Sequence, residues 1–148
     1  MGTWFVAMAL AGALVGSGVR ALDLAQSNTD TRTVWDGVYS VDQAQRGKQQ
    51  YAGACAACHK EDLSGDGITP GLADDGFIER WDKDTVEGLF TRIKTTMPAD
   101  NPGKLADAEY LDVVAFLLKA NGFPGGPTDL AREGTDSLKN ILIVRVKK

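Results

Sequence analysis

The fold of this chain is decided by one stretch, Gly47-Lys-Gln-Gln-Tyr51-Ala-Gly-Ala-Cys55-Ala-Ala-Cys58-His59. The stretch contains both cysteines and the only histidine among the 148 residues, all within five consecutive positions. Side chains three positions apart lie on the same face of a helix, so one helical turn brings the two thiols together. The imidazole of His59 follows directly. Thiol and imidazole chemistry is therefore confined to a single turn of this chain.

The spacing Cys-x-x-Cys-His is typical of covalent haem c attachment. Each thiol can add to one vinyl group of a porphyrin, and the adjacent imidazole then faces the iron. A zinc site needs four Cys or His ligands, whereas this chain offers three. A thioredoxin-type motif needs a strand before it, and here a helix is expected. A disulfide between Cys55 and Cys58 stays open for an exported protein, but it leaves His59 unexplained. The motif predicts one haem held by both cysteines, with His59 as an iron ligand.

Met97 is the candidate ligand for the opposite side of the iron. The chain has no second histidine, and its other methionines, Met1 and Met8, lie near the N-terminus in an expected leader. A lone methionine more often fills a gap in a core. This one lies in a loop, and Pro98 restricts it to extended backbone. A soft thioether opposite His59 favours ferrous iron, and the pair leaves no open coordination position.

Hydrophobic spacing and capping signals predict three helices, at 41–52, 85–94 and 107–120. The first opens with a capping box formed by Ser40 and Gln43. The third has the most regular apolar spacing, in the residues Tyr110, Val113, Val114, Leu117 and Leu118.

The segments between these helices, 62–76 and 95–104, are long and irregular. Either Asp82 or Asp84 can cap the second helix. Long loops are uncommon in a small domain unless they cover something. Because the helices bury too little apolar surface against one another, we expect an apolar group to fill the space between them.

Residues 41–121 resemble the class I c-type cytochromes, with the motifs in that family's order. Gly47 and Tyr51 resemble the positions of the first helix that meet the last helix. Val113 and Phe116 match the paired apolar and aromatic positions of that last helix. The resemblance implies an all-α, cytochrome c-like fold. Three to four helices would wrap around one covalently attached haem, with irregular N- and C-terminal extensions.

The resemblance also implies roles for residues outside the haem motif. Pro70-Gly-Leu72 resembles the loop whose proline carbonyl accepts a hydrogen bond from the proximal imidazole, here that of His59. Trp81 occupies a place where some relatives bind a haem propionate, with ordinary core packing as the alternative. Met97-Pro98 resembles the distal loop. The iron would therefore be ligated by His59 and Met97.

An apolar run over residues 4–19 predicts a signal peptide, 1–21, cut after Ala21. No Lys or Arg precedes the run, and an uncleaved N-terminal anchor is the alternative. Either predicts export to the periplasm. The expected parts of the remaining chain are an N-terminal arm, 22–39, a cytochrome c domain, 40–122, and a C-terminal extension, 123–148.

These features together favour an electron-transfer protein over an enzyme. It would pass one electron at a time between periplasmic or membrane redox partners, such as a dehydrogenase, an oxidase or a respiratory complex. Similar flanks occur on small cytochromes that accompany quinoprotein dehydrogenases. A fixed haem subunit of a multi-protein complex is the alternative, and a haem enzyme or sensor would need Met97 to leave the iron. The net charge of −4 argues against nucleic acid as a partner. Membrane contact is expected only through an uncleaved leader or a membrane-bound partner.

Overall fold

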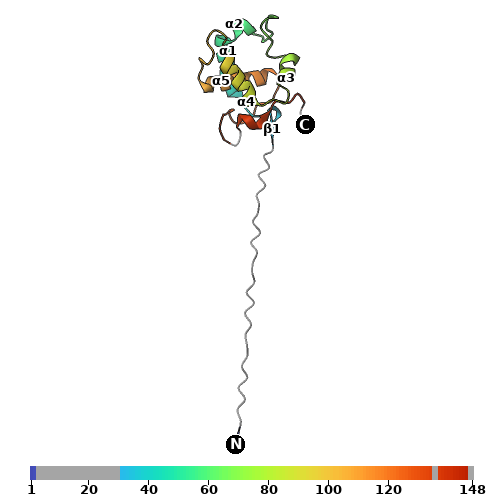
Figure 1. Cartoon of the computed structure of the whole chain (residues 1–148), viewed down its shortest axis with the longest axis vertical. Coiled ribbons are helices and arrows are strands. Elements are labelled where there is room, and N and C mark those ends of the chain that lie inside the picture. The colour runs from blue at the N-terminus through green and yellow to red at the C-terminus, as the bar shows by residue number, and fades with distance from the viewer. Residues whose placement is uncertain (3–30, 135–136, 147–148) are drawn as a thin grey trace.

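The computed structural model describes residues 1–2, 31–134 and 137–146. The predicted signal peptide, apart from its first two residues, and the start of the predicted N-terminal arm lie outside these ranges. The described part is mostly helical (Figure 1), which confirms the all-α fold class. Its elements are β1 (Arg32–Thr33), η1 (Val34–Asp36), α1 (Val41–Ala54), α2 (Ala56–His59), α3 (Asp75–Trp81), α4 (Val86–Thr96), α5 (Asp107–Ala120), η2 (Leu138–Asn140) and β2 (Ile141–Leu142). None of the helices in these ranges has the length and apolar content needed to cross a bilayer.

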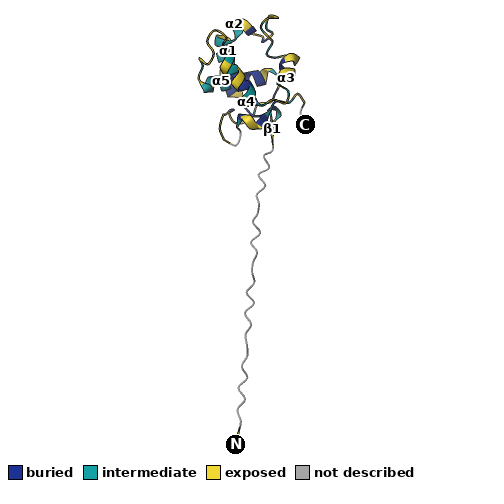
Figure 2. Cartoon of the chain, in the orientation of Figure 1, coloured by how far each residue is buried: buried dark blue, intermediate teal, exposed yellow. Residues whose placement is uncertain are grey.

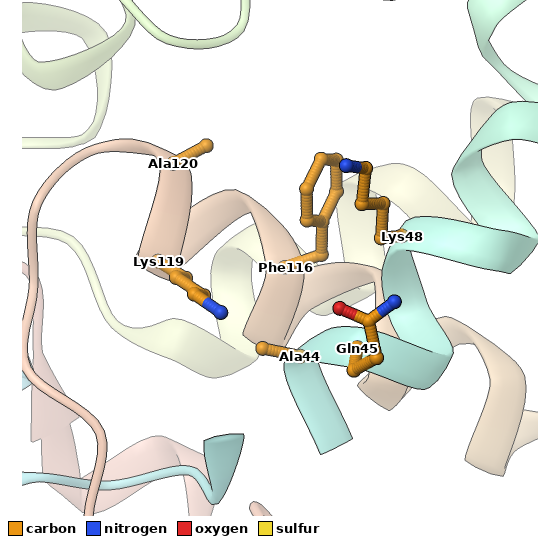
Figure 3. A pocket seen from close by; sticks show the side chains of 6 residues that line it. All are labelled: Ala44, Gln45, Lys48, Phe116, Lys119 and Ala120. Carbon is orange, nitrogen blue, oxygen red and sulfur yellow. The ribbon is translucent and has the colours of Figure 1, made fainter. Parts of the chain in front are cut away.

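The crossing of α1 and α5 is the main helix contact of the domain. At Gly47 a Cβ atom would lie only 1.8 Å from the Asp112 carbonyl oxygen, so the two backbones touch. The rings of Tyr51 and Phe116 pack with their centroids 5.2 Å apart. Figure 3 shows a pocket at this crossing that is lined by residues of both helices, Phe116 among them. The contact expected between the first and last helices is therefore present.

The helix starts follow their capping residues, with two corrections to the sequence analysis. Ser40 caps α1, its hydroxyl accepting from the Gln43 amide at 3.0 Å. The capping box is incomplete, because the buried Gln43 side chain instead pairs with the Leu130 backbone. The cap of α4 is Thr85, whose hydroxyl accepts from the Gly88 amide at 3.1 Å, and not an aspartate before it.

Helix α3 was not among the three helices predicted from hydrophobic spacing. It begins at the end of the segment expected to be irregular, where the Asp74 side chain accepts from the Phe77 amide at 2.7 Å. It has seven residues and buries only Phe77 completely. Two turns are too few to establish a hydrophobic period, which is why the sequence did not predict this helix.

The flanks on both sides of the helical region pack onto it. β1 pairs in parallel with β2, and Val34 and Tyr39 are buried. The Trp35 ring meets the Phe123 ring edge-on, with centroids 5.0 Å apart. From the C-terminal side the buried residues are Leu130, Leu138, Ile141 and Ile143. Figure 2 shows buried residues both at the helix crossing and near β1, so the flanks belong to the same core.

The close approach at Gly47 yields a stability prediction. We expect Gly47→Ala to lower the free energy of unfolding by about 3 kcal/mol or more, because the methyl group forces two helix backbones apart. Gly53→Ala is the matched control in the same helix, since a Cβ there meets nothing within 4 Å. That change should raise stability by about 0.5–1 kcal/mol through helix propensity. Denaturant unfolding followed by circular dichroism measures both, and equal effects would contradict the close approach.

Candidate haem site

The two cysteines and the histidine lie on one backbone turn that continues α1. The Cys55 amide donates to the Tyr51 carbonyl at 2.9 Å, as the last bond of α1. The Cys55 carbonyl then accepts from the amides of Cys58 and His59, at 3.2 and 3.0 Å. The Cys55 side chain is half-buried and the Cys58 side chain is exposed, while His59 is buried. The turn brings together the three groups that the motif predicts.

The orientation of the His59 ring is set by the loop that follows it. Its Nδ1 lies 2.9 Å from the Pro70 carbonyl oxygen, which is the contact expected from the sequence. A carbonyl oxygen can only accept, so Nδ1 must carry the proton. In the neutral ring the lone pair is then on Nε2, the nitrogen that remains for a metal. The donor set of two thiols and a restrained imidazole therefore fits a covalently attached haem.

The loop that carries Pro70 is closed by its own hydrogen bonds. The Gly65 amide donates to the His59 carbonyl at 3.1 Å, and the Leu72 amide donates to the Leu63 carbonyl at 2.8 Å. At the tip, the Asp66 carboxylate accepts from two backbone amides, which lowers its pKa. Gly65 has a positive φ, and a Cβ there would lie 2.2 Å from a carbonyl oxygen. These contacts hold Pro70 over His59.

Tyr51 connects the α1–α5 crossing with the end of the haem turn. Its hydroxyl donates to the carbonyl of Lys60, the residue after His59, at 2.6 Å. Burial raises the pKa of this phenol to about 12. Before the haem is attached, burial also raises the pKa of the Cys55 thiol to about 11. A redox-active Cys-x-x-Cys pair needs the opposite shift, toward thiolate.

Met97 lies at the end of α4, in the extended conformation expected before Pro98. Its amide donates to the Ile93 carbonyl at 2.8 Å, and its carbonyl accepts from the Tyr110 hydroxyl, also at 2.8 Å. The Tyr110 side chain is buried. The sequence analysis placed Tyr110 only in the apolar stripe of α5. The hydroxyl of Tyr110, a polar group within this apolar stripe, was the sequence signal for a second role of the residue.

Trp81 is the last residue of α3 and is half-buried, with its ring 6.5 Å from that of Phe77. The hydrogen bonds among the described residues link His59 to Pro70, and link neither Trp81 nor Met97 to the haem motif. These two residues lie at the ends of α3 and α4. Their predicted roles toward a haem stay predictions.

Apolar side chains that are only half-buried occur on each element near the haem motif. Figure 1 shows α2, α3 and α4 arranged around a common centre, with α1 and α5 along one side. The half-buried side chains on these elements and their connections include Ala56, Leu72, Ile78, Trp81, Ile93 and Leu105. Apolar surface facing water costs about 25 cal/mol per Å². Such a set of residues fits an apolar, planar group.

Comparison with known families gives a match over the helical region. Residues 42–117, just over half of the chain, match the family described as cytochrome C oxidase, cbb3-type, subunit III. The match contains both cysteines, His59, Pro70, Trp81 and Met97. No curated protein and no solved structure matches the chain. The chain therefore belongs to this family and is a c-type cytochrome whose cofactor is covalently bound haem c.

Proposed function

We propose that this cytochrome carries single electrons between redox partner proteins, with its iron held by His59 and Met97. The observation that carries the proposal is the contact between His59 Nδ1 and the Pro70 carbonyl, at 2.9 Å. It leaves Nε2 as the nitrogen that would bind the iron, and it would strengthen the imidazole as a donor. When bound, haem c supplies one-electron exchange between ferric and ferrous iron.

Different residues of the chain have different roles in holding the haem. Cys55 and Cys58 hold the cofactor through thioethers, and Pro70 holds the His59 ring in position. On the other side, Met97 supplies the thioether ligand. Its backbone is restrained by Pro98 and by the Tyr110 hydroxyl. Trp81, at the end of α3, is the proposed donor to a haem propionate.

Ligation by both His59 and Met97 would leave no iron position for a substrate and would therefore favour transfer of electrons over catalysis. The proposed location is the periplasm. The apolar run at residues 4–19 and the haem motif together support it. The proposed electron donor is a dehydrogenase, and quinoprotein dehydrogenases are among the candidates. An oxidase or another respiratory complex is proposed on the acceptor side.

A second candidate is a fixed haem subunit of a multi-protein respiratory complex. The description of the matched family, a subunit of an oxidase, favours it. The long flanks give the fixed-subunit candidate little support, because their described parts pack on the cytochrome domain of the same chain. Gln43 binds the Leu130 backbone, and Arg46 of α1 lies 2.7 Å from the Asp129 carboxylate.

The two candidates differ in how the native protein purifies. A fixed subunit should co-purify with a larger partner from solubilised envelopes at physiological salt. A free carrier should elute as a monomer. Size-exclusion chromatography followed at the haem absorption band, with the 15.8 kDa chain as reference, decides between them.

The proposed ligand Met97 can be tested directly. We expect Met97→Ala to remove the red absorption band of sulfur-ligated ferric haem and to lower the midpoint potential, because the soft ligand is lost. The intact mass should still include one haem. Asn101→Ala, an exposed change in the same loop, is the control and should keep both properties. Retention of the band in Met97→Ala would exclude this ligand.

The contact between Tyr110 and the Met97 carbonyl yields a related prediction. We expect Tyr110→Phe to cost about 1 kcal/mol of stability, the usual net value of one hydrogen bond. The sulfur band should then disappear at a lower denaturant concentration than the helical signal does. Tyr39→Phe is the matched control, because its buried hydroxyl donates to the Phe123 carbonyl at 2.6 Å instead. It should lose similar stability while band and helical signal disappear together. If both variants behave alike, Tyr110 has no particular role at Met97.

A further inference from the structure

The C-terminal segment Ile141–Arg145, called the strap below, pairs with the connection between α3 and α4. The Lys83 amide donates to the Ile143 carbonyl at 2.7 Å, and the Ile143 amide donates to the Asp84 carbonyl at 2.8 Å. Thr85 and Leu142 form an antiparallel bridge next to them. The strap lies outside the family match, which ends at residue 117. It is therefore an addition to the domain that reaches one of its internal connections.

The other edge of the strap is bound to the N-terminal flank. Arg32 and Thr33 of β1 pair with Ile141 and Leu142 of β2. Further along, the Trp35 indole N–H donates to the Val144 carbonyl at 2.9 Å. The side chains of Ile141 and Ile143 are fully buried. The strap thus lies between the N-terminal flank and the α3–α4 connection, and its contacts with the flank do not involve α3.

Arg145, at the end of the strap, contacts α3 along its length. Its guanidinium lies 3.1 Å from an Asp75 carboxylate oxygen and 3.3 Å from one of Glu79. Its backbone amide donates to the Asp82 carboxylate at 3.0 Å. These groups are largely exposed, so each ion pair contributes little to stability. Their arrangement ties the first turn, the middle and the cap of α3 to one residue, which restricts the orientation of the helix.

Helix α3 needs such external support. Helices this short are not stable alone in water. The extensive helix contacts of the domain join α1 with α5 and α4 with α5, and do not include α3. Its anchors are the buried Phe77 and the strap. Trp81, the last residue of α3, lies directly before the segment that the strap pairs with.

We propose that the strap is a positioning element for the haem: it fixes α3 and thereby holds Trp81 at the cofactor. This inference rests on the proposed function, in which Trp81 donates to a propionate. Loosening the strap lets the indole move away from the propionate, which changes the electrostatic environment of the iron. The strap therefore takes part in setting the potential at which this cytochrome exchanges its electron.

The test compares Arg145→Ala with Lys139→Ala in the haem-loaded protein. Lys139 is an exposed residue of η2, so its removal changes the charge equally without touching α3. In Arg145→Ala we expect amide exchange in residues 75–81 to accelerate about threefold to tenfold. Exchange in α5 should stay unchanged, and the midpoint potential should shift. Lys139→Ala should change neither α3 exchange nor the potential. Unchanged α3 exchange in Arg145→Ala would overturn the proposal.

A double-mutant cycle with Trp81→Phe separates positioning from a plain charge effect. Phenylalanine lacks the indole donor, so Arg145→Ala should shift the potential much less in that background. An undiminished shift in the Trp81→Phe background, or no shift in either, would show that the strap acts only on stability or by its charge. The band measured for Met97→Ala tests the proposed function separately. If the double-mutant cycle contradicts the positioning role of the strap, the result for Met97→Ala is unaffected.

Discussion

The contact of two helix backbones at Gly47 is the constraint on which the site depends. Because α1 and α5 touch there, the direction in which α1 continues is fixed relative to α5. The haem turn follows α1 with no intervening loop, since Cys55 is both the C-cap of α1 and the N-cap of α2. α5 in turn holds Met97 through Tyr110. One crossing thus relates the two segments that supply the proposed iron ligands.

The site is completed by backbone groups as much as by side chains. The Pro70 carbonyl orients His59, and the Met97 carbonyl receives the Tyr110 hydroxyl. A substitution at position 70 would leave a carbonyl in place, so the sequence of this loop determines the site mainly through its conformation. Gly65, with its positive φ and no room for a Cβ, is one position where that conformation is restricted.

Local signals in the sequence were sufficient for the elements that have a regular period. The ends of α1, α4 and α5 were predicted within two residues of their observed positions. The predicted N-cap of α4 was wrong because several residues before α4 can cap a helix. Only the backbone conformation at Thr85 selects one of them. Contacts between distant residues were not predictable. Gln43 pairs with Leu130, 87 positions away, and nothing near Gln43 indicates it. The Pro70 contact was expected only through family resemblance, because loop closure has no hydrophobic period.

The place of β1 has a practical consequence for how this cytochrome can be attached to something else. β1 joins the body at the end remote from α2 (Figure 1). A tether, tag or electrode linker introduced just before residue 31 would emerge there, with the haem turn pointing away from the support. Molecules immobilised in this way would have β1 near the support and α2 at the far end of the body.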